Sequence, residues 1–308
     1  MKIPVFLGGV YYEAGEPVDI GEAPLSESTC ALLRAPENGL MHFSCYPGNL
    51  HEKVVAAAKG ALTISQRSAE HISTVFVISS MVDARNNLDG QWLAALAKDL
   101  QLEHADFYSV GLAGCAGFHA GLRLASAMVG AGDTDNALIM SFDQVGEALD
   151  RVYGEGTDFI YVTGDAASAC VVSRQPEGLS YALPGGVQYT SNTRQIEHFS
   201  NETDMRSLSA LIKKAYRQAD VTAQAINHFV CNNYTLQATQ LFSQLAGLSR
   251  SKATPGQLPR YGHCFSSDNL INLKRLEDDS ALHPGDQILL LSTGPFQAGA
   301  CVITRLEC

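Results

Sequence analysis

The stretch VGLAGCAGFHAGLRLASAMVGAG, residues 110–132, decides the fold and raises the main functional question. Small residues surround Cys115 at an expected strand-to-helix junction, and an alanine-rich helix is expected to follow. A cysteine at the start of a helix lies at the positive end of the helix dipole, which favours the thiolate. Its own N–H can also face a developing oxyanion. Cys115 is therefore either a core cysteine or a nucleophile.

The composition is that of an acidic globular protein. The chain has 308 residues, 46% of them hydrophobic and 17% charged, with a formal net charge of -11. This charge argues against nucleic-acid binding, which needs a basic surface. The sequence has no apolar run of the ~18 residues that a membrane span needs. The apolar N-terminus resembles a first strand more than a signal peptide, so we expect a cytoplasmic protein.

The eight cysteines are scattered, and none forms a Cys-x-x-Cys pair. We therefore expect neither a disulfide framework nor a zinc cluster, and we assign no metal and no cofactor. Cys170 and Cys301 lie within apolar runs and are expected to be small buried side chains.

Apolar runs alternate with helical patterns along the chain. Strands are predicted at residues 74–80, 136–142, 158–164, 167–173, 227–233, 287–293 and 299–306. Helices are predicted at residues 49–67, 88–101, 115–130, 207–219 and 266–279. This alternation predicts an α/β protein with layered packing and a mostly parallel sheet.

Two halves of the chain share an order of parts. Each closes on a glycine-containing turn between apolar strands: TGDAASACVV at residues 163–172 and STGPFQAGACVI at residues 292–303. This similarity indicates an internal duplication, with a boundary in the proline- and glycine-containing segment near residues 174–190. We place the N-terminal half at residues 1–174 and the C-terminal half at residues 175–308.

Two other stretches carry chemistry. AINHFVCNNYT, residues 225–235, is an apolar strand that ends in a polar tip, and RYGHCFSSDNLINLKRL, residues 260–276, places His263 before a helix. Functional sites in α/β folds collect at strand ends and the loops after them. His263 can act as a base for a cysteine or as a donor to a carbonyl oxygen. Asp268 is a candidate to orient it, or a charge partner of the helix start.

These motifs together resemble the ketoacyl synthase III enzymes of the thiolase superfamily. GLAGCAGFHAGL is similar to their nucleophile motif, TGDAASACVV to their Gly-Asp turn, and HPGDQILLLSTGPFQAGACVI to their C-terminal segment. The N-terminal KIPVFLGGVYYEAGEPV resembles their first strand and turn. The resemblance spans nearly the whole chain. It implies a thiolase-like fold of two duplicated halves in α-β-α-β-α layers.

The chain departs from the family pattern at two catalytic positions. Asn232 stands where the family's His-Gln-Ala-Asn tip has histidine, and His263 stands where its Gly-Asn-Thr-Ser turn has asparagine. The two residue types are exchanged. The arginine that follows the family's second motif is absent, because Leu236 and Gln237 occupy its place. The early substrate loop, residues 26–47, lacks the family's tryptophan.

The resemblance implies catalytic roles for Cys115, His263 and Asn232, with an oxyanion hole formed by the N–H groups of Cys115 and Gly294. We expect a thioester-dependent acyltransferase with an acyl-Cys115 intermediate. It would pass the acyl group to a hydroxyl, amine or carbon acceptor in polyketide- or fatty-acid-like specialised metabolism.

The expected partners are acyl-coenzyme A or an acyl carrier protein, and a second copy in a homodimer, with a heterodimer as the alternative. No nucleic-acid or membrane partner is expected. Decarboxylative Claisen condensation and a non-catalytic partner subunit remain as alternative functions.

Overall fold

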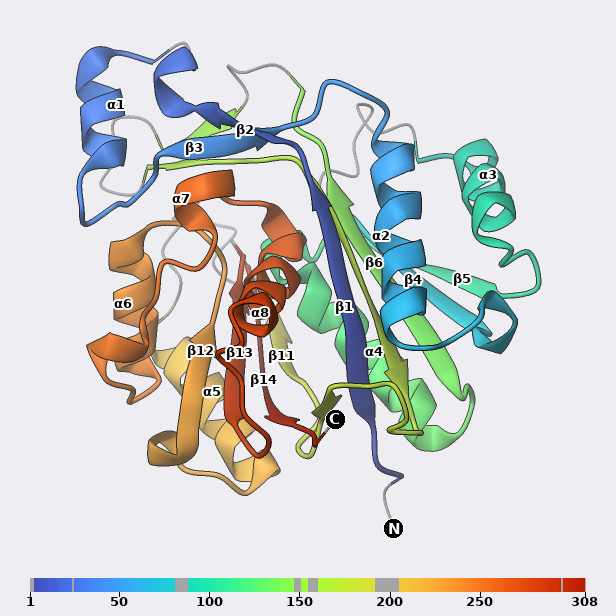
Figure 1. Ribbon diagram of the computed structural model, residues 1–308. Helices are drawn as coiled ribbons and strands as arrows, with labels where there is room; N and C mark the ends of the chain where they lie inside the picture. Colours follow the sequence, from blue (N-terminus) through green and yellow to red (C-terminus); the bar gives the residue numbers. More distant parts are fainter. Residues whose placement is uncertain are drawn as a thin grey trace.

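The computed structural model describes residues 3–23, 25–80, 88–146, 151–154, 160–191, 205–294 and 296–307. A ten-stranded sheet forms the framework of the fold, and helices pack against both of its faces (Figure 1). No helix in these ranges is both long and apolar enough to pass through a membrane.

The strands of the large sheet are β1 (Phe6–Ala14), β4 (Thr74–Ile78), β5 (Asp106–Val110), β6 (Asn136–Asp143), β9 (Ala166–Ser173), β10 (Tyr181–Ala182), β11 (Gln188–Ser191), β12 (Ile226–Val230), β13 (Gln287–Thr293) and β14 (Gln297–Arg305). Two small sheets pair β2 (Glu16–Asp19) with β3 (His42–Cys45) and β7 (Val152–Tyr153) with β8 (Tyr161–Val162). The α-helices are α1 (Glu27–Arg34), α2 (Leu50–Ile64), α3 (Gly90–Leu100), α4 (Gly117–Ala131), α5 (Met205–Ala219), α6 (Leu236–Leu245), α7 (Leu258–Tyr261) and α8 (Asp268–Asp278).

The large sheet is mixed, so the expectation of a mostly parallel sheet is wrong. β4 is parallel to β5 and β6, and β12 is parallel to β13. The other pairings described for this sheet are antiparallel. The physical reason is clearest at β13 and β14, because a short turn joins them and such a turn connects only antiparallel neighbours.

The strand order repeats itself across the sheet. The series β1-β9-β6-β4 and the series β10-β14-β13-β12 have the same sequence of antiparallel, antiparallel and parallel pairings. The two series meet where β1 pairs with β10. This repetition is the arrangement that a duplication would produce, while the boundary between residues 174 and 175 stays a prediction.

Helices and strands stack in five layers, in agreement with the expected α-β-α-β-α packing. α2 and α3 cover one side of β4, β6 and β9, where Leu138 and Met140 join their cluster. Ile139, which points the other way from β6, packs with α4 and α8 in the centre. α5 and α6 cover the far side of β13 and β14. Figure 1 shows α2 and α3 on the flank opposite α5 and α6.

Most predicted elements lie close to their expected places, and β13 coincides with the predicted strand at residues 287–293. The strand at residues 158–164 is an exception. In its described part it is the two-residue β8, which pairs with β7, while residues 158–159 lie outside the described residues. The elements that were not predicted are α1, β2, β3, β7, β10, β11, α6 and α7. Cys170 and Cys301 are fully buried, as expected.

Candidate active site

Cys115 lies in a turn of 3₁₀ helix, Gly114–Ala116, which leads directly from the β5 side of the fold into α4. The backbone reaches this turn through positive φ angles of 57° at Leu112 and 50° at Gly114. The thiol is nearly buried, with 8% of the residue exposed. The structure therefore places the sulfur at the helix N-terminus, where the helix dipole favours an anion.

The start of α4 packs closely against its neighbours because Gly117 has no side chain. A Cβ at Gly117 would lie 2.6 Å from an Ile78 methyl group and 2.7 Å from Ser266 Oγ. Ser266 in turn donates a hydrogen bond to Gly114 O at 2.9 Å. These contacts bring the segment before α8 directly over the Cys115 turn.

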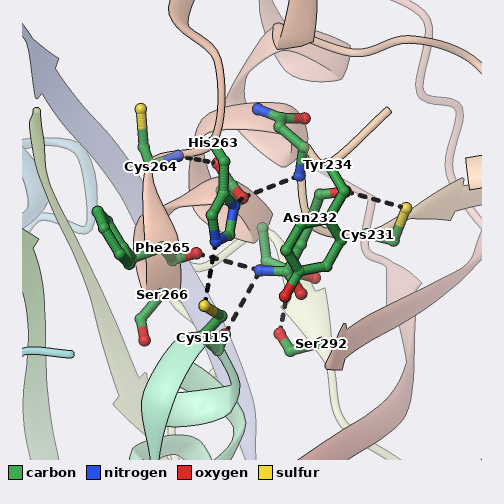
Figure 2. Close-up of polar contacts among 12 residues, drawn as sticks. Cys115, Cys231, Asn232, Tyr234, His263, Cys264, Phe265, Ser266 and Ser292 are labelled. Carbon is green, nitrogen blue, oxygen red and sulfur yellow. Dashed lines mark hydrogen bonds and ion pairs between the residues drawn. The ribbon is translucent and has the colours of Figure 1, made fainter. Parts of the chain in front are cut away.

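His263 reaches Cys115 from that segment (Figure 2). Its Nε2 lies 3.0 Å from Cys115 Sγ. The backbone of His263 is held on both sides, because its N–H donates to Val162 O and its carbonyl accepts from Gly164 N–H. Gly262 precedes it with φ +66°, and a Cβ there would lie 2.6 Å from Val162 O. A glycine is thus required for His263 to approach this closely.

Asp268, the first residue of α8, fixes the other side of the imidazole. Its Oδ2 lies 2.5 Å from His263 Nδ1 and accepts from Asn233 N–H at 2.8 Å, while its Oδ1 accepts from Cys264 N–H at 2.7 Å. His263 and Asp268 are both fully buried. Since the carboxylate can only accept, Nδ1 carries the proton and Nε2 faces the sulfur.

The charges of this chain of contacts support one another. Burial works against a charge on His263, but the Cys115 sulfur and the Asp268 carboxylate outweigh it and raise the pKa of His263 to about 10. Two backbone N–H groups and the start of α8 stabilise the carboxylate. At neutral pH the raised pKa of His263 therefore favours an imidazolium beside the Cys115 sulfur.

Three aromatic rings enclose the imidazole. The ring centroids of Tyr234, Phe265 and Tyr161 lie 4.5, 5.2 and 5.4 Å from that of His263. Tyr234 is the nearest of them and is itself buried. Such rings exclude water, and an aromatic π face attracts a cationic ring.

Asn232 lies beside Cys115, but its amide group serves the backbone. Its Nδ2 donates to Phe265 O at 3.1 Å and to Cys115 O at 3.4 Å, and its Oδ1 accepts from Thr293 N–H at 2.9 Å. The resemblance implied a catalytic role for this residue. In the structure it ties three site segments together.

Gly294 lies beside the Cys115 amide, as an oxyanion hole would require. A Cβ built on Gly294 would be 3.4 Å from Cys115 N. However, the N–H of Gly294 donates to Gln297 O at 2.7 Å and so closes the turn between β13 and β14. Cys115 N–H has no acceptor among the described residues. The first expected donor is therefore available, and the second is engaged.

Sequence reasoning missed three contributors to the site. Tyr234 lies in the polar tip after β12, from which only Asn232 was predicted as a site residue. Tyr161 lies within the strand predicted at residues 158–164 and carries no local signal of function. Val145 packs against Cys115 and Phe265 although it lies far from both in sequence. Only the tertiary fold brings these side chains to the thiol.

Val145, which packs against Cys115, also lines a cavity of about 500 Å³. Phe43, Tyr46 and Arg151 contribute to its walls. The buried Arg151 forms paired contacts of 2.9 Å with both oxygens of Asp165. Asp165 in turn accepts from Val145 N–H at 2.8 Å and therefore holds this wall in place.

The described residues contain no group of three His, Cys, Asp or Glu side chains arranged to hold a metal ion. The chemistry that the described site can support is that of a nucleophilic thiol with a base and an orienting carboxylate.

Comparisons with known proteins agree with this arrangement. Residues 112–184 match the family described as 3-oxoacyl-[acyl-carrier-protein (ACP)] synthase III, and residues 216–305 match the C-terminal part of the same enzyme family. The chain belongs to the ketoacyl synthase III-like group of the thiolase superfamily. The first match includes Cys115, and the second includes His263.

The curated relatives are distant in sequence. A β-ketoacyl-[acyl-carrier-protein] synthase III of Deinococcus deserti is 25% identical over 58% of this chain and 57% of its own length. A second such synthase, from Vibrio vulnificus, is 22% identical over 80% of this chain and 72% of its own. The chain thus spans little more than half of the first relative's length.

Solved structures show the same fold over nearly the whole chain. The structure described as ChlB3, an acyltransferase, has a TM-score of 0.85 at 19% identity and covers 99% of this chain and 98% of its own. The 3-oxoacyl-[acyl-carrier-protein] synthase III of Aquifex aeolicus has a TM-score of 0.79 at 15% identity, covering 97% and 99%. The thiolase-like fold predicted from the motifs is confirmed.

Proposed function

We propose that this protein is an acyltransferase that takes an acyl group from a thioester onto Cys115 and passes it to a hydroxyl or amine acceptor. The observation that carries the proposal is the continuous contact from Cys115 Sγ to His263 Nε2 at 3.0 Å and from His263 Nδ1 to Asp268 at 2.5 Å. A base in this position serves both the formation and the transfer of an acyl-enzyme.

In the first step the Cys115 thiolate attacks the carbonyl carbon of the donor thioester. A carbon–sulfur bond forms, and the carbonyl π electrons move to oxygen to give a tetrahedral oxyanion, to which Cys115 N–H donates. The intermediate collapses, the bond to the donor sulfur breaks, and His263 gives its Nε2 proton to the leaving thiolate. The products are acyl-Cys115, a free donor thiol and a neutral imidazole.

In the second step the neutral His263 removes the proton of the acceptor hydroxyl or amine as the acceptor attacks acyl-Cys115. The carbon–sulfur bond to Cys115 breaks, which releases an ester or amide and restores the thiolate beside an imidazolium. Asp268 holds the imidazole in one orientation throughout, because both of its oxygens are fixed by buried donors.

Asn232 favours this reaction over carbon–carbon condensation. In a condensation, donors beside the thiol stabilise the enolate that forms when a malonyl thioester loses CO2. The Asn232 amide already donates to Phe265 O and Cys115 O, which leaves His263 as the side chain of the exchanged pair that faces the sulfur. The structural likeness to ChlB3, described as an acyltransferase, supports the same choice.

Decarboxylative condensation is the second candidate, because the curated relatives are named β-ketoacyl-[acyl-carrier-protein] synthases. The two reactions share the acylation of Cys115 and differ afterwards. Release of CO2 from a malonyl thioester would indicate condensation, whereas an ester or amide formed without CO2 would indicate acyl transfer.

The proposed donor is an acyl-coenzyme A or an acyl carrier protein. The net charge of -11 favours coenzyme A, since carrier proteins are themselves usually acidic and like charges slow their encounter. We propose a cytoplasmic setting in specialised metabolism. We also propose a homodimer: β5 is an edge strand of the sheet, and its Tyr108 and the nearby Leu112 are 43% and 93% exposed.

The test is incubation with a panel of acyl thioesters, followed by mass measurement of the intact protein. We expect an acyl adduct on the wild type and none on Cys115→Ala. His263→Ala is expected to lose turnover to an added alcohol or amine. An adduct that persists on Cys115→Ala would disprove the nucleophile. No adduct with any thioester would instead favour a non-catalytic partner subunit.

A further inference from the structure

The donors around Cys115 leave one position of the oxyanion site unfilled. Among the groups expected to bind a substrate carbonyl, Cys115 N–H alone lacks a protein acceptor within the described residues. Gly294 N–H donates to Gln297 O at 2.7 Å, and Asn232 Nδ2 donates to two backbone carbonyls. A tetrahedral oxyanion is stabilised best by two or more donors. A further donor should therefore lie close to the thiol.

The Tyr234 hydroxyl lies there. It donates to Thr293 O at 2.5 Å, and Thr293 precedes Gly294, whose backbone borders the Cys115 amide. The Cys115 side chain is a charge neighbour of this hydroxyl. The ring of Tyr234 is held against His263, with a centroid distance of 4.5 Å. The hydroxyl is thus placed by two contacts that do not depend on substrate.

The phenol also stays in the state that a donor needs. Burial raises the pKa of Tyr234 well above its usual range, and the neighbouring Cys115 adds to the rise. The hydroxyl therefore keeps its proton at neutral pH. Its present acceptor, Thr293 O, is a neutral carbonyl, and a hydrogen bond to a full oxyanion is the stronger of the two.

We propose that Tyr234 is a catalytic residue that supplies the second donor of the oxyanion hole. On formation of the tetrahedral intermediate, its O–H turns about the carbon–oxygen bond from Thr293 O to the substrate oxygen, opposite the N–H of Cys115. The oxygen of Tyr234 and its ring stay in place, and no proton is transferred. This inference rests on the proposed acylation of Cys115 and identifies what stabilises its transition state.

Tyr234→Phe tests the proposal, because phenylalanine keeps the ring against His263 and removes the hydroxyl alone. Acylation by p-nitrophenyl acetate is followed in single turnover by release of p-nitrophenolate and by intact mass. Alkylation by iodoacetamide is measured beside it, since that reaction consumes the same thiolate without forming an oxyanion. Tyr216→Phe is the control: its hydroxyl also donates to a backbone carbonyl, Ala246 O at 3.0 Å, away from the site.

We expect Tyr234→Phe to acylate roughly 100- to 1000-fold more slowly, the usual effect of losing one oxyanion donor. Alkylation of the variant should be unchanged, which also shows that it is folded, and Tyr216→Phe should behave as wild type in both reactions. An unchanged rate of acylation in Tyr234→Phe would overturn the proposal. An equal loss in both reactions would overturn it too, since the hydroxyl would then act on the thiol.

The ester separates this inference from the proposed function. A wild type that reacts with p-nitrophenyl acetate but with no acyl thioester would refute the proposed donor, while the comparison of Tyr234→Phe with wild type would still decide the role of the hydroxyl. A wild type that is alkylated but never acylated by the ester would refute the oxyanion site itself.

Discussion

Asp268→Asn is the substitution for which the structure makes the sharpest prediction. The two carboxylate oxygens of Asp268 accept from three donors: His263 Nδ1–H, Asn233 N–H and Cys264 N–H. Asparagine has one acceptor oxygen and one NH2 group. In either orientation its NH2 group faces at least one of these donors, so the substitution loses a hydrogen bond as well as the negative charge.

The size of the effect follows from the charged contact. A hydrogen bond to a charged group contributes about 1.5–3 kcal/mol. Loss of this hydrogen bond destabilises the His263 imidazolium by the same amount. Acylation then slows by roughly 10- to 150-fold, because 1.36 kcal/mol corresponds to a factor of ten in rate. The pKa of His263 should fall as well, because Asp268 is one of the two groups that raise it.

The assay is single-turnover acylation together with iodoacetamide alkylation across a range of pH. We expect Asp268→Asn to be slow in both reactions at pH 7. Alkylation should recover as the pH rises, because hydroxide then deprotonates the thiol without the help of His263. Asp278→Asn is the matched control, since it removes an exposed carboxylate from the other end of α8.

Two results would refute this reasoning. Equal rates of acylation in Asp268→Asn and Asp278→Asn would show that the Asp268 carboxylate does not support His263. A loss of acylation that is the same at every pH, with no recovery of alkylation, would mean that the substitution damages the fold of the site rather than the charge of the imidazole.

Three further predictions follow from single contacts. In NMR titrations His263 should stay protonated at pH 7 and lose its proton near pH 10, and in Cys115→Ser this titration should move to lower pH, because the sulfur raises the pKa; an unmoved titration would contradict the ion pair. Burial lowers the pKa of His119 from 6.5 to about 3. The contribution of the neutral His119 to the free energy of unfolding is therefore complete above pH 6.5 and is lost as the pH falls towards 3. In urea unfolding, the stability advantage of wild type over His119→Gln should shrink by about 1.4 kcal/mol per pH unit below 6.5. An advantage that stays constant with pH would exclude this role. Gly299→Ala should destabilise by about 3 kcal/mol, because its Cβ would lie 2.1 Å from that of His119, whereas Gly90→Ala meets nothing within 4 Å and should leave the thermal midpoint unchanged.

Local patterns were sufficient where one segment decides its own structure. The apolar runs at residues 136–142 and 287–293 became β6 and β13, because each is buried on both faces and has no polar alternation to satisfy. The helix after Cys115 followed from its small and apolar residues. The motif resemblance led to the thiolase-like fold, which the comparisons confirm. Strand direction was beyond such patterns, since parallel and antiparallel neighbours have similar apolar runs.

The sequence by itself determined which residue types could perform the chemistry: a thiol at a helix start, a histidine after a glycine, and an aspartate at the start of the next helix. Only the tertiary structure decided how these groups are used. It brings His263 to within 3.0 Å of Cys115 across 148 residues of chain, gives the Asn232 amide to backbone carbonyls, and sets the Tyr234 ring against His263. Hydrogen bonds and close contacts depend on distance and direction, which the order of residues along a chain does not contain.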